Sequence, residues 1–167
     1  MKSILILKDE DFGLKQEKHV EITKRFAARA VLLKGDKIAL MNVTKENHHK
    51  LPGGGVEKNE TLKEALFREL IEETGCKAKI ISEIGKIIEH KTHMNILQTS
   101  YCYIAKVTNE GKPQFDEGEL ESGFRLEWMS INFALKILEK ENPDVYERKF
   151  IRARDLKILR EAKNRLK

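Results

Sequence analysis

Short apolar runs rich in strand-favouring residues recur along most of the chain, and residues with turn chemistry separate them. Their lengths and their β-branched content are typical of strands rather than helices. Two of these runs flank the sequence Lys-Gly-Asp-Lys at 34–37, which predicts a β-hairpin. We expect strands at residues 4–7, 27–33, 38–43, 78–88, 96–107 and 124–129.

The segment 62–74 has a different pattern, because it contains neither glycine nor proline. Thr61 followed three residues later by Glu64 fits a capping box, and Gly75 provides a C-terminal stop. A helix of about three and a half turns is therefore expected. Residues 51–55, which read Leu-Pro-Gly-Gly-Gly, must be non-helical, since three glycines after a proline disfavour a regular helix.

Two further helices are expected to close the chain. Ser130 or Asn132 can cap the first, and Asn142 with Pro143 ends it. Residues 143–166 then form the second helix. The polar segments 44–50 and 116–121 are expected to be loops.

The end of the chain combines an apolar stripe with dense positive charge. Asp155 interrupts this stripe and would need a partner if buried, most simply an arginine. We expect residues 148–167 to form a basic amphipathic helix that docks on the same domain or on a second subunit, beside a main domain of residues 1–147. The apolar positions share one helical face, and the cations lie mostly on the other side: Ile151, Ile158, Leu159, Ala162 and Leu166 against Arg154, Lys157, Arg160 and Arg165.

Composition limits the class of protein. A chain of 167 residues with 40% hydrophobic and 35% charged residues fits one globular domain. No apolar run approaches the roughly 20 residues that span a bilayer, so we expect no membrane segment. Cys76 and Cys102 are the only cysteines, which suits a reducing cytoplasm. Strands mixed with helices in this order predict an α/β sandwich around a mixed sheet.

The net charge of +5 belongs to the tail. Residues 148–167 carry nine basic and two acidic residues, which leaves a charge of −2 for everything before them. The main domain therefore lacks the broad positive charge of a nucleic-acid-binding protein, and nucleic acid is not the favoured partner.

The expected helix at 62–74 carries an unusual concentration of glutamates. Glu69, Glu72 and Glu73 share one arc at helical spacing, and Arg68 offsets only part of their charge. A solvated acidic face is one interpretation, and a site for Mg²⁺ or Mn²⁺, which favour carboxylate and carbonyl oxygens, is the other. An apolar arc on nearly the opposite side is expected to be buried, and it consists of Phe67, Leu70, Ile71 and Thr74.

The sequence around this helix favours the metal site. Residues 54–76 read GGVEKNETLKEALFRELIEETGC, which resembles the Nudix box. The weakest match is Cys76, where the family usually has an aliphatic residue. The matching positions are Gly54, Glu60, Arg68, Glu69, Leu70, Glu72, Glu73 and Gly75.

This resemblance implies a Nudix-like α/β/α sandwich with an extra C-terminal helix, and a loop-helix-loop that holds metal-bound pyrophosphate. Arg68 would orient Glu69, and Glu60 would hold the loop or a further metal indirectly. Mg²⁺ is the implied cofactor, with Mn²⁺ able to substitute. The implied metal ligands are Glu69, Glu72, Glu73 and the carbonyl of Gly53, and the implied substrate contacts are Gly54, Gly55 and Glu60.

Outside the box, three further residues are candidates. In similar proteins an acidic residue just before the last strand reaches the active site, and Glu121 is our choice, with Glu119 and Glu117 as alternatives. His48 and His49 precede Lys50 and the glycine-rich segment closely enough to touch substrate phosphate, although plain surface histidines are the more ordinary interpretation. His49 and Lys50 are our choice as substrate contacts.

The implied function is Mg²⁺-dependent hydrolysis of a pyrophosphate bond in a nucleoside triphosphate or another nucleoside diphosphate linked to a further group. The marks of ADP-ribose and dinucleoside polyphosphate members are missing, because residues 91–94 read Lys-Thr-His-Met. Two alternatives stay open: an RNA 5′-end pyrophosphohydrolase, suggested by the basic tail, and a nucleotide-binding sensor without turnover.

Overall fold

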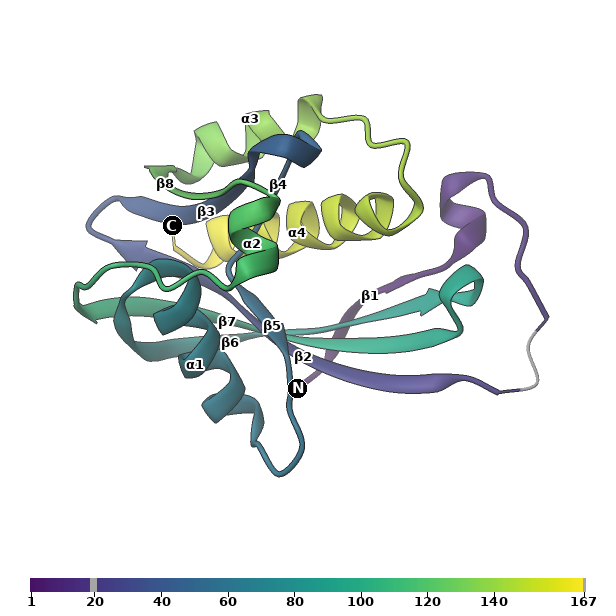
Figure 1. The fold of residues 1–167 in the computed structure, drawn as a ribbon, viewed down its shortest axis with the longest axis horizontal. Helices are drawn as coiled ribbons and strands as arrows, with labels where there is room; N and C mark the ends of the chain where they lie inside the picture. The colour runs from purple at the N-terminus through teal and green to yellow at the C-terminus, as the bar shows by residue number, and fades with distance from the viewer. Residues whose placement is uncertain (19–20, 167) are drawn as a thin grey trace.

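The computed structural model describes residues 1–18 and 21–166. One mixed β-sheet runs through the molecule, and its long strands are β2 (Thr23–Lys34), β6 (Lys77–Lys91) and β7 (Ile96–Asn109) (Figure 1). β7 pairs in parallel with β2 and antiparallel with β6. β1 (Ser3–Leu7) adds a parallel strand to the free edge of β6. All expected strands are present.

The predicted hairpin is confirmed at its turn, but its two strands soon separate. β2 pairs with β3 (Lys37–Val43) only at Leu33–Ile38 and Lys34–Lys37. β3 then pairs with β8 (Phe124–Ser130) on one edge and β4 (His48–Lys50) on the other. β5 (Gly53–Gly55) returns to pair with β2 at the place that β3 has left. This separation brings the glycine-rich segment against the middle of β2.

The helices follow their capping signals. α1 (Leu62–Thr74) has the expected capping box between Thr61 and Glu64, and Gly75 ends it in the left-handed conformation. Ser130 caps α3 (Ile131–Lys140), and α4 (Tyr146–Arg165) begins three residues later than predicted because Val145 is still extended. The expected loop at 116–121 contains a short helix, α2 (Glu117–Glu121), capped by Asp116. Short 3₁₀ turns occupy Asp9–Phe12, Thr44–Glu46 and Thr92–Met94.

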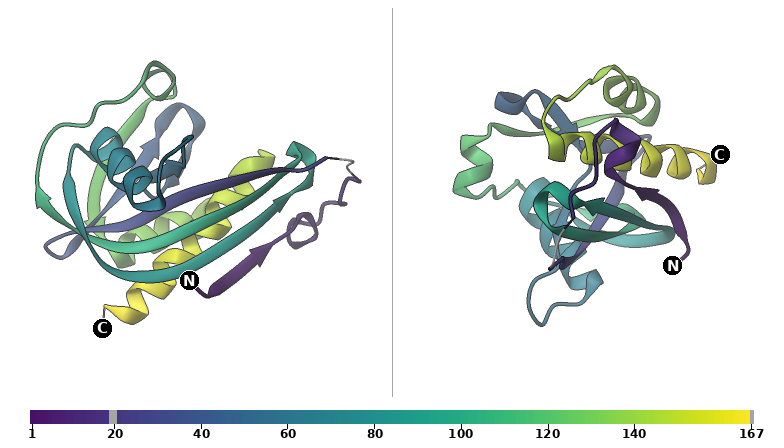
Figure 2. Two further views of the ribbon diagram at one scale, coloured as in Figure 1. Left: turned by 90° about the horizontal axis from the view of Figure 1, so that it is seen from below. Right: turned by 90° about the vertical axis from the view of Figure 1, so that its right-hand side faces the viewer.

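Helices cover both faces of the sheet, which confirms the expected α/β sandwich. α1 lies on one face, and α3 and α4 lie on the other (Figure 2). Alternate residues of β2 point to the two sides: Val31 packs in the core below α4, whereas Ala30 and Leu32 pack below α1. Among the described residues, no helix is long and apolar enough to cross a membrane.

The buried face of α1 differs from the one expected. Ile71 is 38% exposed, and Glu73 is 1% exposed. The buried side chains of the helix are Ala65, Leu66, Leu70, Glu73 and Thr74. The prediction was wrong because it assumed that all carboxylates prefer solvent, whereas Glu73 lies against the backbone of the glycine-rich segment.

α4 packs its middle against the sheet and belongs to the same apolar core as Val31. Ile158, Leu159 and Ala162 of the predicted stripe are buried, but Leu166 is 45% exposed. Arg154, which was expected on the solvated side, is 1% exposed. It is buried because its Nε donates to Asp155 Oδ1 at 2.7 Å, the arginine partner that a buried Asp155 was predicted to need.

Candidate active site

The glycine-rich segment is pressed against β2 so closely that only glycine fits at one position. Gly53 has a φ of 127°, and a Cβ there would collide with the carbonyl oxygen of Ala28. At Gly54, a Cβ would collide with the carboxylate of Glu69. The backbone of β5 therefore forms a flat surface on which side chains of α1 can lie.

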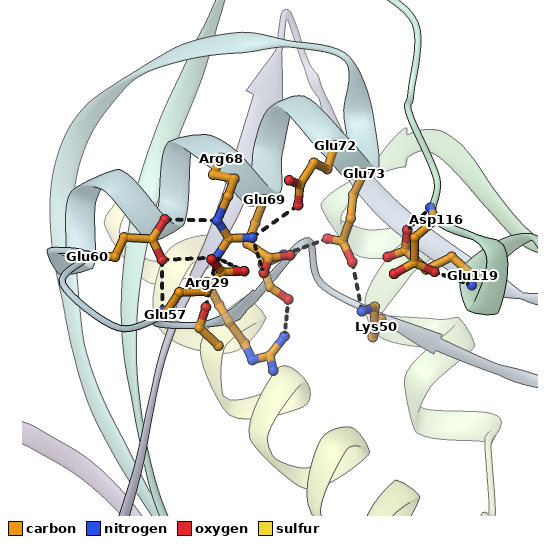
Figure 3. Close-up of polar contacts among 12 residues, drawn as sticks. Arg29, Lys50, Glu57, Glu60, Arg68, Glu69, Glu72, Glu73, Asp116 and Glu119 are labelled. Carbon is orange, nitrogen blue, oxygen red and sulfur yellow. Dashed lines mark hydrogen bonds and ion pairs between the residues drawn. The ribbon is translucent and has the colours of Figure 1, made fainter.

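Arg68 gathers three of the four matching glutamates of the box around one guanidinium (Figure 3). Its Nε and Nη2 donate to the two carboxylate oxygens of Glu60 at 2.8 and 3.0 Å. Its Nη1 donates to Glu69 at 2.9 Å and to Glu72 at 3.1 Å, and Nη2 also reaches the carbonyl of Gly55 at 3.0 Å. The structure thus places Arg68 against Glu69, as the resemblance implied, and uses Glu60 to fix both Arg68 and the loop.

Glu73 is the most deeply buried carboxylate of the helix. Its Oε2 accepts a hydrogen bond from the backbone N–H of Gly53 at 2.7 Å, and its Oε1 lies 2.7 Å from Nζ of Lys50. Burial raises the pKa of nearby Glu69, and the negative charge of Glu73 raises it further, while Arg68 lowers it. Two carboxylates are therefore held close together with cations at their sides.

The oxygen atoms of this cluster are suitable ligands for a hard divalent cation. Glu73 Oε1 is buried without a hydrogen bond, and only the Lys50 ammonium faces it. The Gly53 carbonyl already accepts from Nη1 of Arg29 at 2.6 Å, which leaves its second lone pair. Throughout residues 1–18 and 21–166, no three acidic, histidine or cysteine side chains converge on a single point. The carboxylate and carbonyl oxygens fit a divalent cation, and Arg68 and Lys50 contact the carboxylates in its place.

A cavity of about 240 Å³ opens beside these carboxylates and is lined by charges of both signs. The carboxylates come from α1, α2 and α4, and the cations come from β2, β4, β6 and α4. The charged side chains that line it are Glu69, Glu73, Glu119 and Glu147, with Arg25, Arg29, Lys50, Lys91 and Arg154. Sequence reasoning missed the cations of the cavity apart from Lys50. Arg25 and Arg29 could have been noticed, because they are four residues apart on one strand and so share a face.

Comparison with known proteins identifies the family to which this site belongs. The family model described as the NUDIX domain matches residues 23–150. This chain belongs to the Nudix family. Diphosphoinositol polyphosphate phosphohydrolase 3-beta of Bos taurus is 29% identical over 93 residues, which are 56% of this chain and 54% of that protein. The chain spans about half the length of the curated relatives it matches.

Solved structures share the same fold at low sequence identity. A crystal structure of an ADP compounds hydrolase has a TM-score of 0.63 and 20% identity, and the match covers 87% of this chain and 74% of that one. An ADP-ribose pyrophosphatase from Streptococcus suis 89-1591 has a TM-score of 0.55 and 18% identity, over 84% of this chain and 92% of that one. These similarities confirm the Nudix-like sandwich.

In this Nudix chain the acidic residue brought to the cavity by α2 is Glu119, not Glu121. Glu119 lines the cavity, and burial together with the charge of Glu73 raises its pKa. Glu121 is exposed and does not line the cavity. The choice of Glu121 was wrong because 116–121 forms a helical turn, on which two residues of separation means about 200° of rotation.

His49 was expected beside the substrate, but it does not line the cavity, whereas Lys50 does. The ring Nδ1 of His49 lies 2.6 Å from Glu141 Oε1, on the side of β4 away from the cavity. The segment was expected to be a loop, but it is a strand, and alternate residues of a strand face opposite ways. His48 therefore shares the side of Lys50. Both line a second pocket of about 500 Å³, which also contains Glu119 and Phe124 and continues the cavity.

Proposed function

We propose that this Nudix chain is a Mg²⁺-dependent hydrolase that cleaves a pyrophosphate bond in a nucleoside triphosphate or in another nucleoside diphosphate linked to a further group. One observation carries the proposal: Glu69 and Glu73 of the box line a single cavity together with five cations. Pyrophosphate is an anion that is attacked by water only when its charge is offset, and a cavity of this kind supplies both a base and positive charge.

Each charged residue of the site has its own proposed role in the hydrolysis. Glu69 accepts a proton from the attacking water, because it lines the cavity and Arg68 fixes its carboxylate. Arg68 is a positioning residue, because it holds Glu69 against Gly54. Lys50, whose Nζ lies 2.7 Å from Glu73, neutralises phosphate oxygens of the cleaved bond. A divalent cation bound by Glu69, Glu72, Glu73 and the Gly53 carbonyl would supply the remaining charge neutralisation.

The second pocket suits the group attached to the diphosphate. It adjoins the cavity through Lys50, Glu119, Glu147 and Ile151, which line both. Phe124 offers a ring face there, with Nζ of Lys50 4.8 Å above it. An aromatic face beside a cation suits a base or sugar. The relatives are named for diphosphoinositol polyphosphates and for ADP-ribose, so both compounds belong in a substrate screen.

An RNA 5′-end substrate is less well supported. Several cations of α4 are engaged within the protein: Arg148 Nη2 donates to Glu46 at 2.9 Å, and Arg160 Nη2 donates to Glu139 at 3.0 Å. Arg165 donates to backbone carbonyls of β6. A sensor without turnover is disfavoured by the intact set of box carboxylates. The two cysteines are free and buried, which agrees with our proposal of a cytoplasmic protein.

A screen of nucleotides and diphosphate-linked compounds tests the proposal. The full chain is incubated with each compound and Mg²⁺, and released phosphate, pyrophosphate or monophosphate product is measured. Glu69→Gln, treated identically, controls for contaminating enzymes. We expect turnover that requires the metal and is lost in Glu69→Gln. Turnover that is equal in both proteins, or absent with every compound, would refute the function.

A further inference from the structure

The cations that line the cavity belong to a buried group of charges. Arg29, Lys91 and Arg154 are buried together with Glu89 and Asp155. Lys91 Nζ lies 3.3 Å from Glu89 and 3.9 Å from Glu147, and Arg154 donates to Asp155 and lies 3.7 Å from Glu89. Arg29 donates to the carbonyl of Gly53. Each cation therefore has a partner, but burial of a polar group is costly unless each of its donors is also bonded.

Two donors of this group have no partner among the described residues. Arg154 Nη2 and Arg29 Nε are both buried, and neither makes a hydrogen bond. Both residues line the cavity, and Arg154 is only 1% exposed. A buried guanidinium donor without an acceptor is rare in a folded protein and marks a place where a ligand or ion completes the bonding. The empty positions lie on the cavity side of the sheet.

A third guanidinium completes the set at the cavity mouth. Arg25 is exposed and forms no hydrogen bond or ion pair with any part of the chain that the structure describes. It lies over the glycine-rich segment, since a Cβ at Gly55 would be 3.3 Å from its Nη2. Arg29 and Arg154 are close enough that the charge of Arg154, after burial, lowers the pKa of Arg29. Planar guanidinium groups arranged around one space match the oxygens of a phosphoryl group.

We propose that Arg25, Arg29 and Arg154 form a phosphoryl-binding subsite for a phosphate of the substrate that is not part of the cleaved bond. The carboxylates of α1 and their cation would hold the cleaved diphosphate, and the three arginines would hold the additional phosphate. The cavity of about 240 Å³ has room for both, since it equals roughly eight water molecules in the liquid. The substrate is then a diphosphate that carries at least one more phosphoryl group. This assignment of the substrate rests on the proposed function, whereas the anion site itself does not.

Binding of inorganic tripolyphosphate and pyrophosphate in the presence of EDTA tests the subsite without catalysis. Isothermal titration calorimetry with the full chain should detect one site that prefers tripolyphosphate. Arg25→Gln should weaken tripolyphosphate binding about tenfold, the share of one charge-assisted contact, and reduce the preference over pyrophosphate. Lys24→Gln is the matched control, because Lys24 is the exposed neighbour on the opposite face of β2. It should change binding less than twofold. Equal weakening by both variants, or no binding by the wild type, would overturn the proposal.

Arg154 needs a variant that folds. Arg154→Lys keeps the charge beside Asp155 but removes the unpartnered Nη2 donor, and thermal melting monitors its stability. We expect tripolyphosphate binding to weaken at least about fivefold in a protein that still melts cooperatively. Wild-type binding by a folded Arg154→Lys would remove Arg154 from the subsite. Should this variant fail to fold, Arg29→Lys provides the same comparison on β2.

The catalytic variant separates this inference from the proposed function. Glu69→Gln should bind tripolyphosphate at least as tightly as the wild type, because it removes a negative charge from the same cavity, while its turnover is lost. A wild type that binds tripolyphosphate but hydrolyses no diphosphate would refute the function and leave the subsite intact. An active enzyme whose Arg25→Gln and Lys24→Gln variants behave alike would refute the subsite and leave the function intact.

Discussion

Replacing Glu69 by glutamine should separate catalysis from folding, and the contacts of Arg68 give the expected size of each effect. Glu69 receives one hydrogen bond from Arg68, and Arg68 keeps Glu60, Glu72 and the Gly55 carbonyl in the variant. Weakening one charge-assisted bond costs about 1 kcal/mol, but loss of the charge also removes the burial penalty and the repulsion from Glu73 that raise the pKa of Glu69. For a chain of this length the melting temperature should therefore fall by no more than roughly 2–4 °C.

Turnover should fall much further than stability. Loss of a positioned base or ligand typically reduces the rate about a hundredfold, which corresponds to about 2.7 kcal/mol of activation free energy. Initial rates at saturating Mg²⁺ and melting curves measure the two effects on the same samples. Glu57→Gln is the matched control, since the Glu57 side chain is 72% exposed and its distance of 4.0 Å from Arg68 makes a weak ion pair. This variant should keep full activity. Near-normal turnover by Glu69→Gln, or a loss of activity that tracks unfolding, would show the reasoning to be wrong.

Three other variants probe the loop, the second acidic residue and the buried charges. Gly53→Ala should cost at least about 2 kcal/mol by urea unfolding, because its Cβ meets the β2 backbone, whereas Gly35→Ala, with open space around it, should cost about 1 kcal/mol. Glu119→Gln should reduce turnover ten- to a hundredfold and Glu121→Gln should not; the reverse result would restore the original choice. Burial raises the pKa of Glu89, but the charges of Arg154 and Lys91 outweigh this and hold it below its ordinary value of 4.5. Because the pKa of Glu89 is lowered in the folded protein, its charge stabilises the fold fully above pH 4.5, and this stabilisation shrinks as the pH falls through the folded pKa. The difference in unfolding free energy between the wild type and Glu89→Gln should therefore be largest above pH 4.5, which unfolding measurements between pH 3 and 7 can test. A pH-independent difference would contradict this.

The parts of the fold that the sequence predicts well are those whose causes are local. The ends of α1 follow from Thr61, Glu64 and Gly75, each of which acts within one turn of its own position. The strands follow from apolar runs and turn residues. The box glutamates could also be placed on one helix and linked to Arg68, because their spacing along the chain determines their spacing in space.

The features that the sequence did not predict depend on distant partners. Glu73 is buried because its carboxylate accepts a hydrogen bond from the backbone N–H of Gly53 and pairs with the ammonium of Lys50. Helical periodicity contains no information about either partner. His49 and Glu121 were chosen on segments whose local structure was read as loop. Once a strand or a helical turn is formed there, the neighbouring residues His48 and Glu119 face the site instead.

The basic tail shows why net charge alone is a poor guide to the partner. Its positive charge first suggested RNA, yet α4 lies inside the fold, and Asp155 accepts a hydrogen bond from the backbone N–H of Leu51 at 2.8 Å. Leu51 is two residues before Gly53, so α4 supports the same segment that carries the proposed metal-binding carbonyl. Arg154, the neighbour of Asp155, lines the cavity. A helix that both fixes the loop and adds a buried cation to the site favours a small polyanion, because a long nucleic acid needs cations along an exposed surface.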